Sequence, residues 1–156
     1  MNQPSTATAG GAPFFEEAKM SPNLTTKLAT LTSLLASTQR RAIEIQTACL
    51  SQKFPPIDAA IRISAGMMAS DVLDTLSGIE MSLTQIGNVF ARKGLVHTLQ
   101  KKYPNSEADD LLAALLATHE QALHSRCETL NRADGMVEGT IGLWGQPIRR
   151  GPLWDK

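Results

Sequence analysis

Small or apolar residues recur along residues 24–49 with the spacing of one helical stripe. They stand alternately four and three positions apart: Leu24, Leu28, Leu31, Leu35, Thr38, Ala42, Ile45 and Cys49. This spacing keeps one side of an α-helix facing a partner over about four heptads. Ser21 suits the N-cap, Pro22 suits the first helical position, and Pro55-Pro56 ends the pattern. The sequence therefore predicts a helix from Pro22 to about Lys53.

Two more segments have helical periodicity. Apolar residues recur at three- and four-residue steps from about Ile57 to Arg92, Phe90 among them, and Gly94 is expected to end this second helix. A short amphipathic turn is expected over 95–103. The third long helix is predicted from Ser106 as N-cap to the residue before Gly135.

Three long helices with short connections predict an all-α fold. We expect an elongated antiparallel bundle of three long helices plus a short connecting helix, formed by residues 21–135. Residues 1–20 are polar and rich in Pro, Gly, Ser, Thr and Ala, which predicts a disordered or docking N-terminal arm. Residues 136–156 are rich in Gly, Pro and Trp, which predicts an extended C-terminal tail that either straps the bundle or reaches a partner.

Composition and charge narrow the class of protein. With 15 basic and 15 acidic residues among 156, the chain has no net charge, which argues against a dedicated polyanion binder. Residues 21–54 are mainly basic and residues 105–134 mainly acidic, so we expect these segments to pack as antiparallel neighbours. No apolar run suits a conventional signal peptide or a membrane span, so a cytoplasmic protein is expected.

The sequence contains no strong catalytic or metal-binding pattern. His119 and His124 are five residues apart and diverge around a helix, unlike the histidines of a zincin helix, which are four apart. We therefore expect no catalytic residue, no cofactor and no metal. Cys49 and Cys127 are interpreted as reduced core thiols, with an interhelical disulfide as the alternative.

Several apolar residues lie outside the three stripes and are candidates for partner binding. Ile63, Met67 and Met81 form a second apolar patch on the second helix, and both tryptophans of the chain lie near its end. The predicted partner-binding residues are Phe14, Phe15, Ile63, Met67, Met81, Leu143, Trp144, Leu153 and Trp154.

Polar residues interrupt the apolar stripes at a few positions. They predict a buried polar layer of Thr38, Gln46, Thr75, His119 and Arg126. Such a layer fixes the register between helices, which is the favoured interpretation. A binding site in the bundle core is the alternative.

These patterns favour a non-enzymatic, self-associating helical protein that is a structural or adaptor component of a larger protein assembly. We expect protein partners, a homo-oligomer and no membrane. One alternative is a small secreted or host-directed protein exported without a cleaved signal. The other is nucleic-acid association through the basic corner of Arg92, Lys93, Lys101 and Lys102, which the neutral charge makes less favoured.

Overall fold

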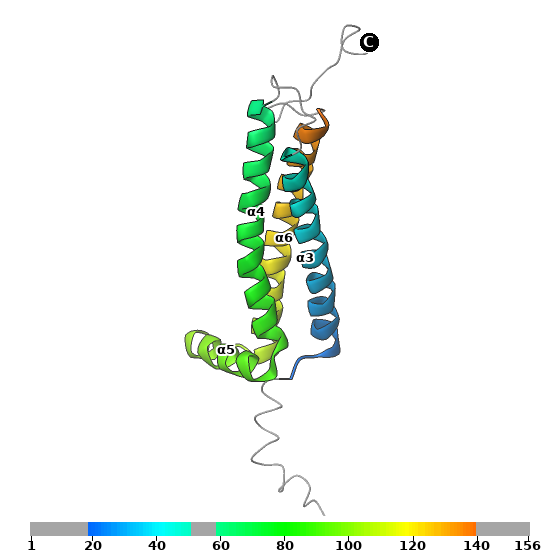
Figure 1. Ribbon diagram of the computed structural model, residues 1–156. Helices are drawn as coiled ribbons and strands as arrows, with labels where there is room; N and C mark the ends of the chain where they lie inside the picture. Colours follow the sequence, from blue (N-terminus) through cyan, green and yellow to red (C-terminus); the bar gives the residue numbers. More distant parts are fainter. Residues whose placement is uncertain (1–18, 51–58, 140–156) are drawn as a thin grey trace, which may run out of the picture. The chain divides into compact units, whose positions relative to one another are not determined.

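The computed structural model describes residues 19–50 and 59–139, and the regular secondary structure in this part of the chain is entirely helical (Figure 1). They are α3 (Pro22–Cys49), α4 (Ala59–Gly87), α5 (Val89–Lys102) and α6 (Ala108–Glu138). The three long helices α3, α4 and α6 pack together, and the short α5 connects α4 to α6. The predicted all-α class is confirmed. Residues 1–18 and 140–156, which hold most of the predicted arm and tail, lie outside the described residues.

The chain divides into two compact units, and each long helix contributes a part to both. Unit 1 contains α3 up to Ser33, α4 from Gly78, all of α5, and α6 up to Gln121. Its core is aliphatic: Leu31, Ile79, Leu83, Ile86, Val96, Leu111, Leu112 and Leu116 are buried. At its surface, Lys27 Nζ lies 2.7 Å from Glu120 Oε1.

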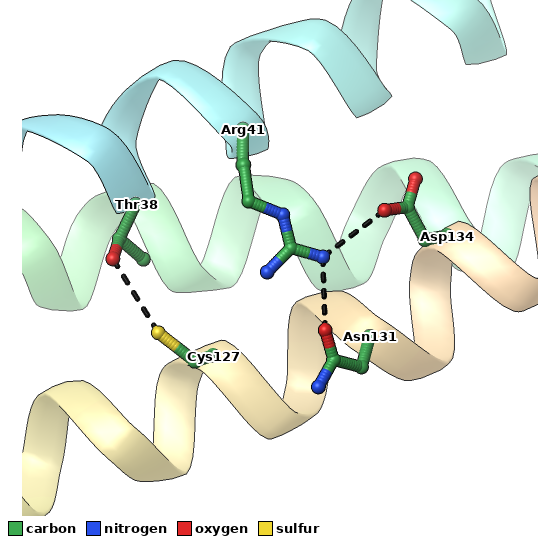
Figure 2. Close-up of polar contacts among 5 residues, drawn as sticks. All are labelled: Thr38, Arg41, Cys127, Asn131 and Asp134. Atoms are coloured by element: carbon green, nitrogen blue, oxygen red, sulfur yellow. Dashed lines mark hydrogen bonds and ion pairs between the residues drawn. The ribbon is translucent and has the colours of Figure 1, made fainter.

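Unit 2 contains α3 from Leu34, α4 up to Ser77, and α6 from Ala122. Figure 2 shows how α3 meets α6 there: Thr38 Oγ1 lies 3.4 Å from Cys127 Sγ, and Arg41 Nη2 donates to Asn131 Oδ1 and Asp134 Oδ2, each at 3.0 Å. Later positions on α3 meet later positions on α6, so the two helices run in parallel within this unit. The predicted attraction between the basic and acidic segments is confirmed by the ion pairs between α3 and α6. Their predicted antiparallel direction is wrong, because α4, which lies between them in the sequence, reverses the direction of the chain.

The predicted stripe on the first helix forms core. Leu31, Leu35, Thr38, Ala42, Ile45 and Cys49 are all buried, while Leu24 and Leu28 are half-buried. The expected N-cap is confirmed, because Leu24 N donates to Ser21 Oγ at 3.4 Å. The helix ends at Cys49, earlier than the predicted Lys53, and Leu50 follows in a turn. Both cysteines are free thiols.

The second helix ends earlier than predicted, at Gly87, and α5 begins two residues later. Asn88 separates them in an extended conformation (φ −95°, ψ 123°), and its Oδ1 accepts the Ala91 N–H at 2.9 Å. Arg92 Nη1 donates to the Ile86 carbonyl at 2.6 Å, satisfying an acceptor that the end of α4 leaves open. Gly94, the predicted terminator, lies inside α5. The N-cap Asn88 therefore marks the end of α4 and the start of α5.

The third long helix is shifted relative to its prediction. It begins at Ala108 rather than directly after Ser106, and it passes through Gly135 to Glu138. Met136 is buried beyond the glycine, so packing outweighs the helix-breaking cost of about 1 kcal/mol. Gly139, with φ 81°, takes the left-handed conformation that ends the helix, and its N–H donates to Met136 O at 3.3 Å.

Replacing Asn88 with alanine tests the cap of α5. N88A loses the acceptor for the Ala91 N–H, so the free energy of unfolding should fall by about 1 kcal/mol in urea denaturation followed by circular dichroism. N88D keeps a side-chain acceptor and should stay close to the wild type. Equal stability of N88A and the wild type would contradict the assigned cap.

Candidate protein-binding groove

A groove of about 550 Å³ lies in unit 2, between the end of α3 and the first half of α4. Its walls combine apolar side chains with a few polar groups. The described residues that line it are Gln46, Cys49, Leu50, Arg62, Ile63, Gly66, Met67 and Ser70. Its size falls within the range of pockets that bury small ligands or a few anchoring side chains.

Local sequence spacing builds the groove. Ile63 and Met67 are one helical turn apart, so both side chains project from the same side of α4. At Gly66 the helices α3 and α4 are in contact, since a Cβ at this position would lie 3.5 Å from Cys49 Cβ, an ordinary van der Waals distance. Leu50 stands directly after the last residue of α3. The groove therefore has a floor of small side chains and a rim of large ones.

The large apolar side chains at the rim of the groove are strongly exposed to solvent. Leu50 is 83% exposed, Ile63 60% and Met67 62%. Contiguous exposed apolar groups of this kind mark interaction sites, whereas isolated ones need no explanation. Three of them around one hollow thus make this groove the strongest candidate site among the described residues.

The thiol at the floor is a poor nucleophile. Burial raises the pKa of Cys49, and the positive charge of Arg62 opposes that rise without cancelling it. The raised pKa keeps the thiol protonated near neutral pH, and the thiolate is the reactive form. Cys49 therefore acts here as a small packing residue.

The structure places the predicted partner-binding residues in different locations. Ile63 and Met67 come together at the groove. Met81 is 74% exposed but belongs to unit 1, where it borders a separate hollow beside Asn88 and Ala91. Phe14, Phe15, Leu143, Trp144, Leu153 and Trp154 lie outside the described residues.

Sequence reasoning missed some exposed apolar residues. Leu50 was not singled out, because its exposure depends on α3 ending at Cys49. Phe90 was expected on the buried stripe, but α5 starts a new helix at Val89 and Phe90 is exposed. Tyr103 is also exposed, and it borders a hollow between α5 and α6 in unit 1 together with Leu99 and Leu115.

The predicted polar layer divides between the units. Thr38 is buried, and its hydroxyl donates to Leu34 O at 2.7 Å. Thr75 donates to Asp71 O within its own helix, and Gln46 lines the groove. Arg126 also belongs to unit 2, and its buried Nε makes no hydrogen bond within the described chain. His119 belongs to unit 1, where burial lowers its pKa.

Other kinds of site find no support in the described residues. No group of three or more His, Cys, Asp and Glu side chains is placed there to hold a metal ion. None of the described helices combines the length and apolar character needed to cross a bilayer. No protein-family model, curated protein or solved structure matches this chain. The groove is therefore the feature of the described residues that bears most on function.

The reactivity of Cys49 should follow its raised pKa. In a C127S background, iodoacetamide should modify Cys49 more slowly than free cysteine at pH 8, and the rate should climb as the pH rises through the thiol pKa. R62Q should slow the reaction further at fixed pH, because it removes the charge that favours the thiolate. Mass spectrometry measures both rates. Modification as fast as that of free cysteine would contradict the burial of this thiol.

His119 should make stability depend on pH. Its pKa is lowered below 6.5 by burial, so the unfolded chain binds the proton first, and stability present above pH 6.5 is lost as the pH falls. Between pH 7 and 5, urea denaturation of H119L should show a smaller loss than the wild type. Identical pH slopes for H119L and the wild type would refute this role of His119.

Proposed function

We propose that this protein is a non-enzymatic, self-associating helical protein that acts as a structural or adaptor component of a larger protein assembly. One observation carries the proposal: the groove of unit 2 with Leu50, Ile63 and Met67 exposed around it. Water contact at these side chains is unfavourable, and a second protein surface would relieve it.

The lining of the groove suits binding better than catalysis. Among the described residues that form it are a guanidinium, an amide, a hydroxyl and a protonated thiol, with no carboxylate and no imidazole. General acid–base chemistry near neutral pH most often uses the two missing groups. The guanidinium, amide and hydroxyl groups that line the groove can instead orient a partner by hydrogen bonds around an apolar centre.

The groove face of α4 is suited to pairing with a second copy of itself. Ile63 and Met67 form a short ridge one turn apart, and the small Gly66 and Ser70 form a shallower row beside it. Ridges and grooves of this kind let two helices interlock. In a two-fold dimer the same patch serves both partners, so every buried contact occurs twice.

The size of the patch predicts weak association. Covering each of the three exposed side chains contributes about 1–2 kcal/mol, or roughly 6–12 kcal/mol over two copies. The loss of translational and rotational freedom costs about 4–15 kcal/mol. The two amounts nearly cancel, so a concentration-dependent equilibrium is expected rather than a permanent dimer.

The nucleic-acid alternative has less support. Arg92, the first residue of the proposed basic corner, is only 6% exposed, and its guanidinium is engaged by the Ile86 carbonyl. Phosphate binding needs accessible cations, so Lys93, Lys101 and Lys102 would have to supply the contact. Export without a cleaved signal remains a prediction that no contact in the described residues favours.

Sedimentation velocity over a wide concentration range tests self-association. The mean mass of the wild type should rise above the 16.8 kDa of one chain as its concentration increases. The double variant I63E/M67E should stay at the mass of one chain, because two buried charges would oppose pairing.

I43E is the matched control, because Ile43 is an exposed residue of unit 2 that does not line the groove. It should associate like the wild type. All three proteins should give the same helical circular dichroism, since the changed positions are exposed. A wild type that stays monomeric at every concentration, or an I63E/M67E variant that associates like the wild type, would overturn the proposal.

A further inference from the structure

The end of α6 lies close to the groove, so the chain that follows Gly139 starts near it. In unit 2, Thr38 meets Cys127 and Arg41 meets Asn131, which are pairs 89 and 90 residues apart. Continuing the same register along these parallel helices places Gly139 level with Cys49 and Leu50. Cys49 and Leu50 form the α3 side of the groove. Segment 140–156 therefore begins at the height of this groove.

Segment 140–156 is long enough to reach the groove of its own chain. The described lining comes from α3 and α4, so the chain must pass about one helix diameter, ~10–12 Å, from the end of α6. An extended chain spans up to about 3.5 Å per residue. Leu143-Trp144 is then just within reach, and Leu153-Trp154 has ample length. A short tether of this kind gives an effective concentration on the order of millimolar.

The chemistry of the segment matches that of the groove. Both tryptophans of the chain lie in it, each directly after a leucine. An indole ring buries a large apolar area and needs an acceptor for its N–H. The exposed Leu50, Ile63 and Met67 offer the apolar contact, and a methionine sulfur packs well against aromatic rings. Gln46 and Ser70 carry oxygens that can accept the indole N–H, and Arg62 can stack on the ring.

We propose that segment 140–156 docks in the unit 2 groove of its own chain through a Leu-Trp pair and competes there with a second copy. This inference rests on the proposed function, because it describes how self-association through the same groove is limited. The docked tryptophan covers Ile63 and Met67, and pairing between copies requires its release.

Tryptophan fluorescence tests the docking directly, because the only two tryptophans of the chain lie in the segment. In the full-length protein, emission should be blue-shifted relative to the urea-unfolded chain, and acrylamide quenching should be at least about twofold weaker than for free indole. I63E/M67E should abolish both effects, and I43E should preserve them. W144F and W154F each leave one reporter and identify the docked pair.

The concentration dependence of this signal decides which copy supplies the segment. Docking within one chain gives a blue shift that is present at low protein concentration and that declines as association at higher concentration releases the segment. A shift that appears only as the concentration rises would assign the segment to a second copy and overturn the proposal. So would emission typical of fully exposed tryptophan, or a blue shift that I63E/M67E leaves unchanged.

A chain ending at Gly139 separates this inference from the proposed function. Both copies must have a free groove to pair, so if the segment fills two thirds of the grooves, its removal should lower the concentration at half-association about ninefold. Fluorescence protection in a protein that stays monomeric with and without the segment would support docking but refute self-association. Equal association of both chains, without fluorescence protection, would refute docking alone.

Discussion

The burial of one continuous stripe on α3 is the constraint on which the other features depend. Leu31, Leu35, Ala42 and Ile45 are all buried, and each large aliphatic side chain contributes about 1.5–3 kcal/mol when it leaves water. Both α4 and α6 must turn an apolar face toward this stripe. Once α4 has done so, its remaining apolar residues Ile63 and Met67 have no place in the core. The exposed rim of the groove is thus the surplus left by core packing.

In unit 2, the polar contacts between α3 and α6 fix the register of the two helices, and they contribute little to the stability of their packing. Arg41 and Asp134 are both more than one-third exposed, so their ion pair is worth about 0.2–1 kcal/mol. Thr38 is buried, and its hydroxyl is satisfied by Leu34 O beside Cys127. A shift along either helix would separate these partners. The alignment they hold brings the end of α6 level with the groove.

Much of the fold could be predicted from the sequence, because helix existence depends on the spacing of apolar residues. Helix ends were harder to place. Gly94 and Gly135 suggested ends, but neighbouring buried residues such as Val96 and Met136 carry the helices through them. Asn88 lies within a sequence whose apolar spacing is helical, and its extended backbone together with its side-chain bond to Ala91 identifies it as a cap. Tertiary packing thus overrides local propensity at these positions.

The candidate site was only partly predictable. The off-stripe positions of Ile63 and Met67 follow from helix geometry. The hollow beside them depends on where α3 ends and on how that end packs against α4.

Methyl NMR of methionine-labelled protein tests the central claim, that the groove face of α4 is where copies of this chain meet. Met67 borders the groove in unit 2, and Met81 is an even more exposed methionine of the same helix in unit 1, so one molecule contains both probe and control. With increasing concentration, the Met67 methyl resonance should shift or broaden while that of Met81 stays unchanged. A Met67 resonance that stays constant while the measured mass rises would contradict the claim.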